Sequence, residues 1–463
     1  MGVPMTAYAG RWTISAAALA VVAAIAAARE QQGAAPASPR DAGSDVTAAG
    51  GSSPKWVRIV ESDEGVLRLA LAARTYEPVD AASNSPEITL VSVMHIGDRA
   101  YYRRLQKVLD DHDLVLYEAV APPGLGAESV DADDATAMAE RTRARMRLLA
   151  AGIESEKRHE GAYPASLAAL GESVHTSRRL ARWLNAAGVD AWGRSFVYVR
   201  SEDGAGFELK SLGADGREGG EGAGADIDWS SEEPLTPQDL AIVSAEDEEH
   251  QIQAKLARAF DLAFQLDEID YERDNWRNSD MGVDELMRRL EASGADGGVM
   301  LDLLSGSSFP ARVASMVLSL VEMIPGAAPR GKLMLIELLG SSDDLLAATG
   351  PMAEAEALMK VIVDDRNQVV IDDLRKVLDS GEMDRSGSGA PRKRVAVFYG
   401  AGHMPDLADR LEEELGFRDK GAKWYSAIRL DLAEEGIGES EVLMVRGMVR
   451  RQLEMMKTMS DGE

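Results

Sequence analysis

The sequence predicts an α/β protein: a sheet of buried strands with flanking helices, interrupted by a small α+β domain. Three apolar runs rich in β-branched residues, at 88–94, 113–117 and 395–400, have the composition of buried strands. A segment with helical spacing, 99–109, lies between the first two runs and predicts a βαβ unit with a right-handed crossover. From about residue 137 the chain changes in composition, which indicates an inserted domain.

Composition narrows the functional classes. The 463 residues suffice for two or three domains, and the 45% apolar content supports real hydrophobic cores. The net charge of −28 argues against a nucleic-acid partner, because proteins that bind nucleic acids need a basic surface. The sequence has no cysteine, which excludes disulfides, thiol catalysis and thiolate metal sites.

Each of the three runs is followed by a side chain that can bind a metal ion: His95, Glu118 and His403. Open α/β sheets bind their ligands at the carboxyl ends of the strands, so we expect these side chains to lie together. Two histidines and a carboxylate are a common ligand set of catalytic metal sites. One histidine at a strand end is more often a hydrogen-bonded structural residue, and the coincidence of three favours a site.

Short motifs around these residues resemble the TraB/GumN/Tiki superfamily, which has two Gly-x-x-His motifs, a glutamate at a strand end and an Arg-Asn pair. The second motif is complete at 400–403, whereas the first, at 92–95, has Ser92 in place of glycine. Glu118 matches the glutamate, and residues 366–367 match the Arg-Asn pair. The resemblance covers about residues 55–125 and 235–430.

The resemblance implies a TraB/Tiki-like sheet and metal-dependent hydrolysis of a peptide or ester bond. By the resemblance, His95, Glu118 and His403 hold a divalent transition metal, and the ligand types suit Zn, Mn or Co equally. The catalytic residues would be Glu118, Arg366 and Asn367. Arg366 would stabilise the developing oxyanion, and Asn367 would hold substrate or orient Arg366.

Three motifs of the inserted stretch resemble the carboxy-terminal domain of the major pseudopilin of the type II secretion system, protein G. They are Tyr-Pro-x-Ser-Leu at 163–167, Asp-x-Trp-Gly-x-x-x-x-Tyr at 190–198, and a glycine-rich acidic loop at 211–227. The resemblance covers about residues 142–229 and implies secretion-system or envelope partners. The prepilin cleavage signal and its polymerising helix are missing, so we do not expect assembly into a pseudopilus.

The glycine-rich loop has the chemistry of a calcium site. Half of residues 213–224 are glycine, which lets the backbone turn tightly and direct carbonyls inward. Asp215, Asp226 and Asp228 add carboxylates, and Ca²⁺ prefers such oxygen ligands. The resemblance implies that the loop binds calcium, with Asp215 and Asp226 as the foremost ligands. The alternative is an acidic loop without an ion.

Residues 13–28 form an almost unbroken apolar run after Arg11, which predicts a secretory signal peptide or a membrane anchor. The run is shorter than the roughly 20 residues of a spanning helix, and a buried helix of a soluble protein is the remaining alternative. Both membrane-directed roles imply export to the periplasm or cell envelope, with an inner-membrane tether if the segment is retained. Residues 31–54 are rich in Ala, Ser, Gly and Pro and predict a flexible linker.

For some polar residues the sequence favours a structural role. We expect Asp280 to cap a helix and His112 to lie in a solvated turn. For Arg366, the alternative to catalysis is a surface ion pair with Asp364 or Asp365. Further helices are predicted at 251–266, 313–323, 332–339, 353–378, 406–415 and 441–459, a hairpin at 56–60 and 66–71, and a strand at 423–430.

The combined hypothesis is an exported metal-dependent hydrolase that carries a calcium-binding pseudopilin-like module. The alternative is a non-enzymatic envelope or secretion-associated protein that acts through the protein G-like domain. The predicted division is 1–30 signal peptide or anchor, 31–54 linker, 55–136 and 232–435 core, 137–231 insert, and 436–463 amphipathic tail.

Overall fold

The computed structural model describes most of the chain between residues 55 and 460. The described residues are 55–128, 130–131, 133–173, 178–201, 203–230, 233–236, 239–240, 243, 260–293, 328–341, 359–386 and 390–460. The predicted signal peptide or anchor, the linker and the predicted helix at 313–323 lie outside them. None of the described helices is long and apolar enough to cross a membrane.

Four parallel strands form the centre of a seven-stranded sheet. β11 (Arg394–Gly400) lies between β3 (Glu87–Val93) and β5 (Leu114–Tyr117), and β10 (Trp276–Asn278) pairs with the other edge of β5. Helix α2 (Arg99–Asp110) connects β3 to β5, which confirms the predicted βαβ unit. Because all four strands run in the same direction, their carboxyl ends lie at one edge of the sheet.

The long strand β2 (Val66–Pro78) joins this parallel centre to an antiparallel part. It pairs along one edge with β1 (Val57–Glu61) and then β3, and along the other edge with β12 (Phe417–Asp431). These pairings confirm the predicted amino-terminal hairpin and the predicted strand at 423–430.

Alternation along the buried strands provides both faces of the sheet with apolar side chains. On β11, Val395, Val397 and Tyr399 point to one face, whereas Ala396 and Phe398 point to the other. Such near-continuous apolar strands are typical of a sheet with helices on both faces, and the predicted α/β class is confirmed. The first face packs against α15 (Arg366–Ser380) and α16 (Met404–Glu413), and the second against α2, α12 (Ala328–Gly340) and α17 (Glu439–Ser460).

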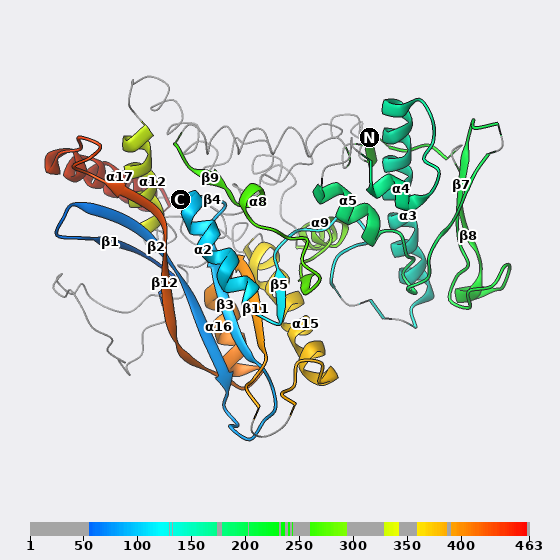
Figure 1. Ribbon diagram of the computed structural model, residues 1–463, viewed down its shortest axis with the longest axis horizontal. Helices are drawn as coiled ribbons and strands as arrows, with labels where there is room; N and C mark the ends of the chain where they lie inside the picture. The colour runs from blue at the N-terminus through cyan, green and yellow to red at the C-terminus, as the bar shows by residue number, and fades with distance from the viewer. Residues whose placement is uncertain are drawn as a thin grey trace.

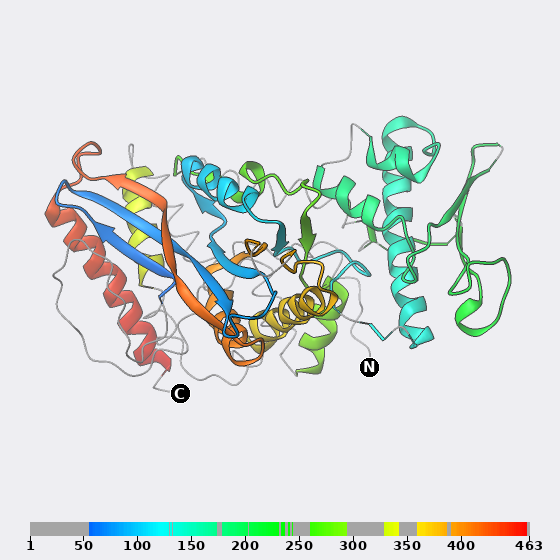
Figure 2. The same cartoon turned by 60° about the horizontal axis from the view of Figure 1, so that its bottom comes forward.

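The residues of the predicted insert form a helix-and-sheet unit at one end of the molecule, with the seven-stranded sheet toward the other end (Figures 1 and 2). Its long helix α3 (Ala135–Glu160) follows Asp134, whose carboxylate accepts from two helix N–H groups. The helix ends before Gly161, which has the left-handed conformation. The other elements are α4 (Leu167–Gly171), α5 (Arg178–Ala186), β6 (Val197–Arg200), β7 (Phe207–Ser211), η2 (Gly222–Gly224) and β8 (Ile227–Ser230).

Two of the sequence motifs of the insert have clear local reasons. Ser166 of the Tyr-Pro-x-Ser-Leu motif caps α4 by accepting a hydrogen bond from Ala169 N–H. Asp190 is buried, its Oδ1 accepts from two backbone N–H groups of its own turn, and its Oδ2 accepts from Ser211 on β7. These contacts join the turn to the three-stranded sheet β6-β7-β8.

Two predictions of local structure are wrong. The helix predicted over 251–266 does not continue through its described end, because Ala263–Phe264 forms strand β9, which pairs with β4 (Ile96–Gly97). A short helix, α8 (Gln265–Glu268), follows it. His112 is buried rather than solvated, and it bonds to the Val108 carbonyl and the Thr89 hydroxyl.

The remaining elements are α9 (Val283–Ala292), η3 (Lys360–Asp365) and η4 (Ala401–His403).

Candidate functional site

The carboxyl ends of the four parallel strands supply the polar residues of the site. His95 follows β3, Glu118 follows β5, and His403 closes the turn after β11. Asp280 follows β10 in the same way. Helix α15 brings Arg366 to this edge from the next layer. The predicted residues are therefore delivered to one edge, and Asp280 is an addition that sequence reasoning placed elsewhere.

Arg366 lies at the centre of the site and is almost completely buried, with 1% of its side chain exposed. Its Nε and Nη2 donate to the two carboxylate oxygens of Asp280 at 2.9 and 2.6 Å, and Nη2 also donates to Glu118 Oε1 at 2.8 Å. Burial opposes the charge, but the two carboxylates raise the pKa of Arg366 above its ordinary value. A surface ion pair with Asp364 or Asp365 is thereby excluded.

The expectation that Asp280 caps a helix is wrong. The helix begins at Val283 with Gly282 as its cap, while Asp280 is fully buried and bidentate on Arg366. The pairing of Asp280 with Arg366 is only weakly indicated by the sequence, because β10 has only three residues and the arginine is 86 positions away.

Glu118 is held as an anion. Besides the Arg366 contact, its Oε2 accepts from Gly400 N–H at 2.7 Å. Burial would raise the pKa of Glu118, but His403, Arg366 and this N–H together lower it below its ordinary value. A Cβ at position 400 would lie 3.2 Å from Glu118 Oε2, so glycine allows this close approach.

His403 is fully buried and fixed in one tautomer. Its Nδ1 lies 2.7 Å from Asn367 Oδ1, and the Asn367 amide nitrogen donates to the His403 carbonyl and to Asp406. The amide oxygen can only accept, so Nδ1 carries the proton and Nε2 keeps its lone pair. This Nε2 lies 3.6 Å from Glu118 Oε1 and 3.4 Å from Arg366 Nη1. The described contacts of the Asn367 side chain go to His403 and Asp406.

His95 has the same design, although it is only partly buried. Its Nδ1 lies 2.9 Å from Gln265 Oε1, and the Gln265 amide nitrogen donates to the Tyr271 hydroxyl. The backbone N–H of Gln265 also donates to the His95 carbonyl. His95 therefore also carries its proton on Nδ1, and burial lowers its pKa against the opposing effect of Glu118. Gln265 and Tyr271 were not anticipated from the sequence.

The serine that replaces glycine in the first motif is accommodated within β3. Ser92 is buried, its hydroxyl donates to the Ala72 carbonyl on β2 at 2.5 Å, and its carbonyl accepts from Tyr101. The side chain therefore faces the neighbouring strand, and the turn at His95 does not depend on a glycine at position 92.

The donor chemistry suits a divalent ion: two neutral imidazoles whose Nε2 atoms carry lone pairs, and one ionised carboxylate. The arrangement, however, places the Arg366 guanidinium beside two of these donors. Among the residues that the structure describes, no group of three or more His, Asp or Glu side chains has the geometry of a metal site.

The predicted calcium ligands divide into two groups. Asp226 and Asp215 lie in the glycine-rich loop; Asp226 Oδ2 accepts from Gly219 N–H, and its Oδ1 is buried with no hydrogen-bond partner. A buried oxygen without a partner fits a cation ligand. Asp228 lies on β8 with most of its side chain exposed, and Lys210 Nζ lies 3.6 Å from a carboxylate oxygen of both Asp228 and Asp226. Two of the three predicted ligands therefore lie in the loop, and the third lies on the following strand.

The comparisons with known proteins bear on the insert. Residues 130–230 match the family model of the type II secretion system (T2SS), protein G. This segment of the chain is similar to protein G, as its motifs predict. The comparison with curated proteins and that with solved structures gave no match. The resemblance of the remaining chain to the TraB/GumN/Tiki superfamily stays a prediction.

The site should make stability depend on pH in a defined direction. Burial lowers the pKa of His403 from 6.5 to about 4, so between these values the unfolded chain takes up a proton that the folded protein does not. The free energy of unfolding should therefore fall from pH 6.5 to 4, by on the order of 3 kcal/mol. His403→Gln should remove this part of the slope, measured by chemical denaturation of chelator-treated protein.

His159→Gln is the matched control, because this histidine is exposed on α3. It should keep the wild-type slope. If the His403 variant and the wild type had the same slope between pH 6.5 and 4, the buried neutral state of His403 would be refuted.

Proposed function

We propose that this protein is an exported envelope hydrolase that cleaves a peptide or ester bond at the His95–Glu118–Arg366–His403 site. The observation that carries the proposal is the matched treatment of the two imidazoles. An amide oxygen holds each Nδ1, which leaves Nε2 as a lone-pair donor, and in His403 this atom lies near an ionised carboxylate. The two site histidines share a side-chain amide as the acceptor, whereas the structural His112 bonds through Nδ1 to a backbone carbonyl.

In the proposed hydrolysis, each residue of the site would have a distinct role. His95, His403 and Glu118 would hold a divalent Zn, Mn or Co ion, which supplies an activated water and polarises the scissile carbonyl. Arg366 would stabilise negative charge on the substrate oxygen. Its Nη1 would make this contact, because both of its present hydrogen bonds are long, at 3.4 Å. Asn367 would keep the His403 tautomer, and Asp280 would keep the Arg366 fork in place.

The similarity of residues 130–230 to protein G supports the export and envelope part of the proposal. It also supports a second candidate function, in which the chain acts without catalysis through secretion-system or envelope partners. In both, the glycine-rich loop would bind Ca²⁺ through Asp215 and Asp226, and the partnerless Oδ1 of Asp226 supports this. Residues 13–28 would serve as the tether if they are retained.

Elemental analysis of the purified protein separates the two functions. The hydrolase proposal expects about one divalent transition ion per chain and loss of most of it in His403→Ala. His159→Ala, at an exposed histidine, should retain the ion. Arg366→Lys should keep the ion but lower kcat on a responsive peptide or ester by roughly 10²- to 10³-fold. Equal metal content in wild type and His403→Ala would eliminate the metal site.

Calcium should stabilise the insert. A glycine-rich loop gains little from its own packing, so ion binding adds to the folding free energy. We expect chelation of Ca²⁺ to lower the melting temperature, and Asp215→Ala to have the same effect without a further response to chelator. Asp203→Ala, in the turn between β6 and β7, is the control and should respond like wild type. A melting curve that does not change with chelator would favour the ion-free loop.

A further inference from the structure

The loop that follows Glu118 is in direct contact with the insert. Arg145 of α3 donates to the Gly124 carbonyl at 2.7 Å through Nε and to the Val189 and Asp190 carbonyls through Nη1. Arg141, one turn earlier, donates to the carbonyls of residues 124, 126 and 128. Two guanidinium groups of the insert therefore provide hydrogen-bond partners to a run of loop carbonyls.

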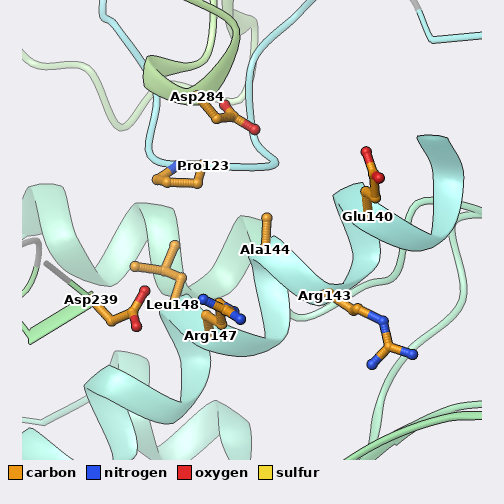
Figure 3. A pocket seen from close by; sticks show the side chains of 8 residues that line it. All are labelled: Pro123, Glu140, Arg143, Ala144, Arg147, Leu148, Asp239 and Asp284. Atoms are coloured by element: carbon orange, nitrogen blue, oxygen red, sulfur yellow. The ribbon is translucent and has the colours of Figure 1, made fainter. Parts of the chain in front are cut away.

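The contact is close because the loop carries a glycine where α3 passes. Gly124 has a φ of 77°, and a Cβ there would lie 2.7 Å from the Arg141 carbonyl oxygen. Ala121, at the start of the loop, is fully buried in the apolar core of the insert. Figure 3 shows Ala144 and Leu148 of α3 directed toward Pro123 across a groove of about 370 Å³.

The opposite side of the same loop is bonded to the segment that carries Asp280. Ala127 N–H donates to the Asp280 carbonyl at 2.7 Å, and Ala121 exchanges two backbone hydrogen bonds with Met281 and Val283. Gly282 N–H donates to the Glu128 carboxylate at 2.9 Å. The loop therefore lies between α3 and the Asp280 segment, and its first residue adjoins Glu118.

We propose that Arg141 and Arg145 of the protein G-like segment are positioning residues for the Glu118–Arg366–Asp280 site. They hold the 119–128 loop, the loop holds the backbone at 280–283, and Asp280 holds Arg366. The insert is then a structural part of the site, and a partner bound to it is kept in a fixed place relative to the site. The inference depends on the proposed function only in treating the Arg366 site as the working site.

Hydrogen exchange measured by mass spectrometry on the full chain tests this without an activity assay. Arg141→Ala and Arg145→Ala should each speed exchange at peptides covering 119–128 and 276–284 by roughly tenfold, and the double variant by more. Arg145→Lys keeps the positive charge on a single donor nitrogen but loses the guanidinium fork, and it should show a smaller effect. Arg143→Ala is the matched control, because Arg143 is exposed on the same helix and points away from the loop (Figure 3).

Faster exchange at 119–128 with wild-type exchange at 276–284 would overturn the proposal, because the two arginines would then hold the loop without affecting the Asp280 segment. Uniformly faster exchange across the insert, including α4, would also overturn it, because the arginines would then only support the insert. Exchange does not require catalysis, so a lack of hydrolysis would refute the proposed function and leave this inference standing. The single variants keep the test valid if the double variant does not fold.

Discussion

The buried ion pair of Arg366 with Asp280 and Glu118 is the interaction on which the site depends. It joins three elements that are distant in the sequence: α15, the end of β10 and the end of β5. Buried salt bridges contribute little net stability, but removing one partner costs roughly 3–5 kcal/mol because the remaining charge is left uncompensated. The pair therefore acts less as a source of stability than as a constraint on where these elements can lie.

This constraint gives the site its electrostatic character. Two carboxylates face one guanidinium, while the nearby imidazoles of His95 and His403 have lowered pKa values and stay neutral at pH 7. The two carboxylates leave the described site with an excess of negative charge, and the neutral imidazoles add lone-pair nitrogens to it. The two carboxylate partners fix the Arg366 guanidinium beside the His403 imidazole.

The sequence predicted the part of the site that depends on strand direction. His95, Glu118 and His403 each follow a run whose apolar composition identifies a buried parallel strand, so their common edge could be inferred. Asp280 could not, because β10 is too short to show a pattern and its partner lies on another layer. The burial of His112 was missed for a related reason: its partner Thr89 lies 23 positions away on a neighbouring strand.

The proposed hydrolysis depends on the tautomers of His95 and His403, because it requires an unprotonated Nε2 in both residues. Long-range ¹H–¹⁵N correlation NMR of chelator-treated protein at neutral pH reports them directly. In both residues we expect Nδ1 to be protonated and Nε2 to be unprotonated. A proton on Nε2 of either residue, or an imidazolium at His403, would contradict this expectation.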